Sequence, residues 1–260
     1  MACKICDGAM EPVLTGRVLQ KYDVTYHRCT TCGLVQTDEP FWLEEAYGSA
    51  IASVDLGPIS RAVRNARIVE TLLLTSFDVE GRYIDWGAGY GVFVRMMRDL
   101  GYDFRWRDQH CENLFATHFV ADPQIKHELL TTFEVFEHLP DPVKGVEEML
   151  THADSIFFST TLAPAEGIKD WWYLTPETGQ HITFYTLDAL HRLGDRHGLK
   201  LYSNGHDYHL FTRKRVRWRL FQAAVRDGTA AALLRPVLRR RAGKTSLLEK
   251  DWAAVSGWKV

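Results

Sequence analysis

A glycine-rich turn constrains the fold of this chain most. The run Arg82–Ile84 predicts a short buried strand, glycines stand at Gly87, Gly89 and Gly91, and apolar residues then repeat at helical spacing over 92–100. Strand, glycine turn and helix open a nucleotide-binding α/β unit, because glycines admit a ligand close to the backbone and a helix start offers unpaired N–H groups. The third glycine comes one residue earlier than in a dinucleotide fingerprint. A tight turn without a ligand is the alternative.

Acidic residues end the first two predicted strands. Asp85 closes the strand before the glycine turn, and Asp108 closes a strand predicted over 102–107. An acid about 20 residues after such a turn accepts hydrogen bonds from ribose hydroxyls, and Asp108 has this spacing. The alternative for Asp108 is an aspartate in a surface loop.

A further strand predicted over 128–133 leads into Phe-Glu-Val-Phe-Glu-His-Leu-Pro-Asp-Pro at 133–142. Together with the Asp-x-Gly-x-Gly-x-Gly pattern at 85–91, this segment resembles class I S-adenosylmethionine-dependent methyltransferases, whose fourth strand ends beside the cofactor. The resemblance spans roughly residues 60–212. It implies a Rossmann-like α/β fold, with an open, mostly parallel sheet and helices on both faces.

The resemblance also implies S-adenosylmethionine as cofactor. Because this cofactor carries no phosphate, the turn needs only to accommodate its methionine part. The segment 108–128 is short, and Asp122 is its one candidate for the acid that usually holds the adenine. The cofactor-binding residues implied by the resemblance are Asp85, Gly87, Ala88, Gly89, Gly91, Asp108 and Glu134.

Four of the five cysteines form two pairs, Cys3-x-x-Cys6 and Cys29-x-x-Cys32, and a glycine follows each pair. Two such pairs separated by a loop predict a four-thiolate zinc site, with disulfides or free thiols as the alternative. Four thiolates leave no open coordination position, so the zinc is expected to be structural. Two short strands predicted between the pairs would make a zinc ribbon too small to fold on apolar burial alone.

A four-cysteine lobe ahead of this domain resembles the C-methyltransferases of deoxysugar biosynthesis and related polysaccharide-pathway enzymes. Those enzymes carry one histidine after the fourth strand and another before the helix of the sixth; His138 and His181 occupy the matching places. The resemblance implies His181 as the acid–base residue, with His138 and Tyr47 as further catalytic candidates. Structural roles are the alternatives. Gln180 stands where the sugar enzymes have an acid, and their further C-terminal domain is absent from this sequence.

Length, charge and hydropathy restrict the class of protein to which this chain can belong. At 260 residues the chain can bury a sizeable core, and its net charge of −2 gives no global preference for nucleic acid. No run approaches the ~18 apolar residues of a membrane span, and the N-terminus lacks the apolar core of a signal peptide. A cytoplasmic location is therefore expected. We predict three parts: a zinc-ribbon lobe at 1–47, a methyltransferase domain at 48–212 and a helical tail at 213–260.

The tail is strongly basic. Between residues 213 and 244 it holds eleven Lys or Arg and one acid, with apolar residues interleaved, which predicts amphipathic helix. Three interpretations stay open: a solvated helix covering the sheet edge, a helix on a membrane surface or an acidic partner, and an RNA-contacting surface.

The sequence as a whole predicts methyl transfer from S-adenosylmethionine to a small-molecule acceptor, a sugar or a glycan-linked group. An RNA base methyltransferase with a zinc lobe is the alternative among enzymes, and it would use the basic tail. A non-catalytic zinc-ribbon adaptor is the alternative outside enzymes. The intact glycines and Asp108 argue against the adaptor.

Overall fold

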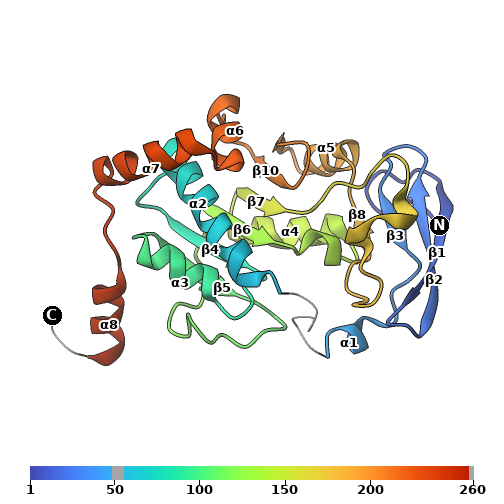
Figure 1. Ribbon diagram of the computed structural model, residues 1–260, viewed down its shortest axis with the longest axis horizontal. Coiled ribbons are helices and arrows are strands. Elements are labelled where there is room, and N and C mark those ends of the chain that lie inside the picture. Colours follow the sequence, from blue (N-terminus) through green and yellow to red (C-terminus); the bar gives the residue numbers. More distant parts are fainter. Residues whose placement is uncertain (49–55, 258–260) are drawn as a thin grey trace. The chain divides into compact units, whose positions relative to one another are not determined.

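The computed structural model describes residues 1–48 and 56–257, and its chain divides into two compact units. Unit 1 comprises Met1–Val54, Thr132–Leu150 and Phe157–Arg213, and unit 2 comprises Asp55–Thr131, Thr151–Ile156 and Lys214–Val260. Three of the divisions fall inside elements, namely strand β6 (Leu129–Phe133), helix α4 (Pro142–His152) and strand β7 (Ser155–Ser159). The chain therefore alternates between the units several times. Figure 1 labels the elements.

A six-stranded sheet has the order β5-β4-β6-β7-β10-β9. Strand β4 pairs in parallel with β5 and with β6, whereas β10 pairs with β9 in antiparallel fashion. This sheet confirms the predicted open α/β fold. Its strands are β4 (Arg82–Trp86), β5 (Asp103–Arg107), β6 (Leu129–Phe133), β7 (Ser155–Ser159), β9 (Lys200–Ser203) and β10 (Tyr208–Thr212).

Helices α2 (Pro58–Ser76) and α3 (Val92–Asp99) belong to unit 2. The apolar positions of α2 recur every three or four residues, which places them on one face of the helix. Ala62, Val69 and Leu73 on this face are at most 8% exposed. The residues 108–128 between β5 and β6 contain no helix and no named strand. This connection is therefore as short and irregular as the sequence suggests.

Helix α4 (Pro142–His152) begins at a proline that follows a capping residue. The N–H of Lys144 donates to Oδ1 of Asp141 over 3.1 Å, so the Asp141 side chain caps the helix ahead of a proline at its first position. Helix α5 (Leu187–Arg196) has a similar cap, because Thr186 Oγ1 accepts from the N–H of Ala189.

Unit 1 contains a second sheet of four antiparallel strands in the order β1-β2-β3-β8. Its strands are β1 (Met10–Val18), β2 (Tyr22–Cys29), β3 (Val35–Thr37) and β8 (Thr183–Phe184). A buried core joins this sheet to the short helix α1 (Leu43–Ala46) and to the 3₁₀ turns η2 (Ile168–Asp170) and η3 (Trp172–Leu174). The N-terminal ribbon is thus completed by residues from the long connection after β7.

The basic tail forms three helices, α6 (Trp218–Arg226), α7 (Thr229–Arg241) and α8 (Leu248–Ser256). Asp227 adopts a left-handed conformation with φ of 44°, which ends α6. Helices α6 and α7 pack against α2. Arg98 of α3 forms a bidentate ion pair with Asp251 of α8, with an Nη2–Oδ1 distance of 2.6 Å. Among the described residues, no helix has the length and apolar character to cross a membrane.

Candidate functional site

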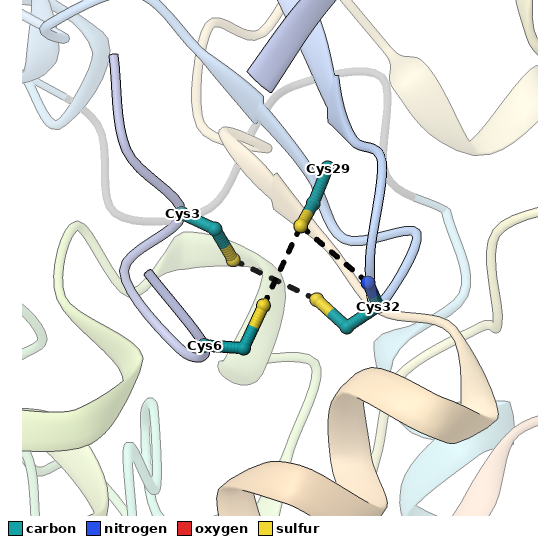
Figure 2. Close-up of side chains that lie close together, drawn as sticks. All are labelled: Cys3, Cys6, Cys29 and Cys32. Carbon is teal, nitrogen blue, oxygen red and sulfur yellow. Dashed lines mark hydrogen bonds between the residues drawn. The ribbon is translucent and has the colours of Figure 1, made fainter. Parts of the chain in front are cut away.

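The four N-terminal cysteines converge on one point in unit 1 (Figure 2). Their Sγ atoms all lie within 4.8 Å of one another, with Cys3–Cys32 at 3.6 Å and Cys6–Cys29 at 3.5 Å. Sulfurs placed tetrahedrally about 2.3 Å from a zinc ion are separated by close to these distances. The thiols form no disulfide. The donor set therefore fits a structural zinc ion, which these four residues can hold.

The backbone around the cysteines turns its N–H groups toward sulfur. The N–H groups of Thr31 and Cys32 each approach Sγ of Cys29 at 3.4 Å, an arrangement that favours a thiolate. A hydrogen bond from Cys32 lowers the pKa of Cys3 to about 5. At Gly8 an added Cβ would lie 2.6 Å from Thr31 Oγ1 and 3.0 Å from Cys29 Sγ. This close packing explains the glycine after the first pair.

The glycine turn of unit 2 lies between β4 and α3 and is fixed to the end of β5. The N–H groups of Gly87 and Ala88 both donate to the carbonyl of Arg107, at 2.9 and 3.2 Å. Gly89 has a φ of 53°, and a Cβ added to it would meet no atom within 4 Å. At Gly91, with φ of 86°, an added Cβ would lie 3.2 Å from the backbone nitrogen of Ala116. Gly89 thus borders open space, whereas Gly91 allows close packing.

Asp108 faces this turn. Its Oδ2 accepts from the N–H of Gly89 over 2.8 Å, and its Oδ1 accepts from the N–H groups of His110 and Cys111 at 2.7 and 2.9 Å. Trp106 Nε1 also donates to the carbonyl of Gly89 over 2.7 Å. Three backbone donors therefore fix the Asp108 carboxylate beside the open space at Gly89.

Asp85 at the end of β4 is 3% exposed. Thr131 of β6 donates to its Oδ1 over 2.7 Å. Burial raises the pKa of Asp85 to about 8, and the charge of Asp108 acts in the same direction. The carboxyl is therefore largely protonated at neutral pH. It serves as a buried hydrogen-bonding group behind the turn.

Glu134 begins the segment after β6 in unit 1 and has a φ of 54°, a conformation that costs a non-glycine residue about 1–2 kcal/mol. Ser159 compensates, because its Oγ accepts from the N–H of Glu134 at 3.0 Å and donates to Oε1 at 2.5 Å. The hydroxyl of Tyr173 lies 3.1 Å from Oε2 of Glu134 and 2.7 Å from Oε1 of Glu137. Two carboxyl groups thus share one tyrosine hydroxyl.

Tyr47, His138 and His181 come together in unit 1. The hydroxyl of Tyr47 lies 2.8 Å from Nδ1 of His138, and the His138 and His181 rings are 5.0 Å apart between centroids. The Nδ1 of His181 lies 2.7 Å from the backbone carbonyl oxygen of Tyr173. A carbonyl only accepts, so Nδ1 of His181 carries the proton and a neutral ring has its lone pair at Nε2.

Comparison with protein families establishes the functional class of this protein. Residues 60–204, more than half of the chain, match a family described as a methyltransferase domain. The chain belongs to this family. Membership confirms the predicted enzyme class, an S-adenosylmethionine-dependent methyltransferase, and the predicted methyl donor.

Solved structures resemble this methyltransferase at low identity. An O-methyltransferase family 2 protein from Planctomyces limnophilus DSM 3776 shares 12% identity, with a TM-score of 0.45. The likeness covers 65% of this chain and 65% of that protein. In the complex between the Haloferax volcanii Trm112 methyltransferase activator and the putative methyltransferase, a chain shares 13% identity, with a TM-score of 0.48 and coverage of 66% and 98%.

Human N-acetylserotonin methyltransferase shares 12% identity with this chain, with a TM-score of 0.42 and coverage of 68% and 67%. A comparison with curated proteins found no significant match. The assignment to the methyltransferase family thus rests on the match of the family itself.

Sequence reasoning missed three residues that the structure places in these clusters. Trp106 holds the glycine turn, and Tyr173 and Glu137 lie behind the histidines. Trp106 lies on β5, two residues before Asp108, so the alternation of side chains along an extended segment could have indicated it. Tyr173 lies in the irregular connection after β7 and is 36 residues from Glu137, so no local pattern pointed to it.

Proposed function

We propose that this methyltransferase acts on a small molecule, a sugar or a glycan-linked group. The cluster of Tyr47, His138 and His181 carries the proposal. These residues come from three segments far apart in the sequence, yet they lie within hydrogen-bond or ring-contact distance of one another. The cluster offers a hydroxyl and two imidazoles to a polar acceptor. A cytoplasmic location remains part of the proposal.

His181 is the proposed base. An acceptor hydroxyl or carbon must lose a proton as it is methylated, and histidine accepts protons near neutral pH. The bond from Nδ1 to the Tyr173 carbonyl orients the ring, and Nε2 is the atom that we propose receives that proton. His138, hydrogen-bonded to Tyr47, is placed to polarise or orient the acceptor.

S-adenosylmethionine, when bound, supplies an activated methyl group on its sulfonium. The open space at Gly89 and the fixed carboxylate of Asp108 fit such a cofactor in unit 2. Asp108 would accept from the ribose hydroxyls, and the glycine turn would accommodate the methionine part. The side chain of Asp122 accepts a hydrogen bond from the N–H of Gln124. We propose that Asp122 is the acid that holds the adenine of the cofactor.

The experiment is a methyl-transfer screen over nucleotide-sugars and glycan acceptors with the wild type and His181→Ala. For an acceptor that the wild type methylates, turnover of His181→Ala should fall ~10²–10⁴-fold, the usual range for a general base. Its cofactor affinity and melting temperature should stay close to the wild-type values. Full turnover, or unfolding of the variant, would assign His181 a structural role and direct attention to His138 or Tyr47.

Gly89→Val and Asp108→Ala are the controls for the cofactor. The added valine fills the open space at the turn, and Asp108→Ala removes a charged acceptor, which should cost on the order of 1.5–3 kcal/mol of binding. Calorimetry with S-adenosylmethionine should show weaker binding for both. Unchanged affinity in both variants would contradict the cofactor site and leave the histidine cluster untouched.

Binding assays test the alternatives to a sugar acceptor. An RNA base methyltransferase would retain RNA in filter assays, with an affinity that falls steeply as salt rises. We expect weak retention, because Arg235, Arg239 and Lys244 of the tail form ion pairs with acids of unit 2. Flotation with anionic vesicles tests a membrane contact in the same way. A protein that binds no cofactor at all would instead be the adaptor.

A further inference from the structure

Gln180 does not supply an anionic partner for the adjacent His181. The Gln180 side chain is 7% exposed, and its Nε2 donates to the carbonyl of Ala46 over 3.0 Å. A carboxylate at this place would face that carbonyl without a proton to donate. Gln180 therefore holds the residues after η3 against helix α1, and any negative charge near His181 comes from elsewhere.

Glu137 is an acid beside both histidines. Its side chain is fully buried, and one of its carboxylate oxygens lies within 4.8 Å of a ring nitrogen of His138 and of His181. Its backbone carbonyl accepts from the N–H of Ile182, directly after His181, over 2.9 Å. Oε1 is hydrogen-bonded to Tyr173, whereas Oε2 is buried with no hydrogen-bond partner among the described residues. An uncompensated buried carboxyl oxygen is costly unless a cation forms nearby.

We infer that Glu137 is the anionic partner of the His138–His181 pair, a positioning residue that stabilises the imidazolium formed when His181 removes the acceptor's proton. The proton moves from the acceptor to Nε2 of His181, while Nδ1–H keeps its bond to the Tyr173 carbonyl. The carboxylate does not touch the acceptor and acts only through the histidines. This role rests on the proposed function of His181 as the base.

The charges around Glu137 agree with this role. Burial raises the pKa of Glu137 to about 8, and the charge of Glu134 raises it further. A positive charge on a neighbouring imidazole acts in the opposite direction, because it favours the carboxylate form of Glu137. The titratable groups that face Glu137 are Glu134, His138, Tyr173, His181 and Tyr185.

The first test needs no acceptor. Histidine-labelled protein is titrated by NMR, and the imidazole pKa of His181 is compared between wild type and Glu137→Gln. Gln preserves the size of the side chain and a hydrogen bond to Tyr173 but removes the charge. We expect the pKa of His181 to fall by about one unit or more, because a carboxylate favours imidazolium. An unchanged pKa would overturn the inference, whatever the acceptor proves to be.

The second test uses the acceptor found in the screen. In Glu137→Gln the acid limb of the kcat profile should move to lower pH, and its plateau should fall ~10–100-fold, because the remaining base is weaker. The KM for S-adenosylmethionine should not change. Glu137→Asp retains the charge and should restore part of both effects. If Glu137→Gln does not fold, the NMR titration of Glu137→Ala decides, because alanine also removes the charge, and an unaltered His181 pKa there counts against the role.

Tyr185→Phe is the matched control. It removes another buried hydroxyl beside Glu137, one that bonds the carbonyl of Phe136, without removing a carboxylate. Its pH profile should match that of the wild type, and the same shift in this variant would indicate a merely structural effect. Metal analysis gives a further decisive outcome. A second metal ion per chain that is lost in Glu137→Gln would overturn the inference, because the histidines would then be ligands and not bases.

Discussion

Buried carboxyls link the stability of this protein to pH. The pKa values of Asp85 and Glu137 are both raised to about 8, from ordinary values of 3.8 and 4.5, mainly by burial. A carboxyl with a raised folded-state pKa stabilises the fold fully at low pH. It loses that contribution as pH rises through the folded-state value. Stability should therefore decline as pH rises from the ordinary values of 3.8 and 4.5 to about 8.

We predict that the unfolding free energy of Asp85→Asn declines less steeply with pH than that of the wild type. Between pH 6.5 and 8 the wild type should lose ~1–2 kcal/mol of unfolding free energy for each of the two carboxyls, at about 1.4 kcal/mol per proton and pH unit. Asn cannot ionise but still accepts from Thr131, so the variant should lose about half as much as the wild type. Denaturant unfolding at several pH values measures this. Equal slopes would mean that Asp85 is ionised in the folded protein.

At the scale of single elements, the folding of the N-terminal ribbon depends on bound metal. Purified protein should contain one zinc ion per chain, and Cys29→Ser should lose it. Strands β1 and β2 should then exchange their amide hydrogens faster, while β4 in unit 2 stays protected. Cys111→Ser is the control, because Cys111 lies outside the cluster. Absence of metal from protein purified without chelator would count against the zinc site, as would equal metal loss in the control.

Helix α7 is attached to α2 by a buried charge. Glu70 is 1% exposed and forms a bidentate ion pair with Arg239. Glu70→Gln should lower the unfolding free energy by roughly 1–3 kcal/mol, because it removes a charged partner at a buried site. Glu44→Gln on exposed α1 should change stability little. If the two variants unfold at the same denaturant concentration, the tail does not depend on this pair for its attachment.

At the scale of the whole molecule, local patterns predicted most of the central domain. The strand–glycine–helix signal at 82–100 depends on neighbours in the sequence, so spacing alone was enough to find it. Strand β8 has only two residues, Thr183 and Phe184, and pairs with β3 across a gap of nearly 150 residues. The position of β8 depends on tertiary packing, which the hydrophobic pattern of the sequence does not indicate.

The residues of the candidate site likewise fall into those that local motifs identified and those that they did not. The glycines, Asp108 and the cysteines belong to compact motifs whose spacing follows from their chemistry. His138 and His181 could be located only through resemblance to a family. Glu137 and Tyr173 could not be singled out, because their meeting depends on how the connection after β7 folds. The predicted three-part division of the chain remains a prediction beside the two interleaved units of the structure.

The pairing of β3 with β8 sets an order of events during synthesis. Strand β3 ends at Thr37, and β8 begins at Thr183. A ribosome adding 5–20 residues per second needs on the order of ten seconds to make the chain between them. The cysteines are therefore all translated long before the strand that closes their sheet. During this interval the nascent ribbon has a free edge at β3, and zinc capture by the four cysteines can already stabilise it.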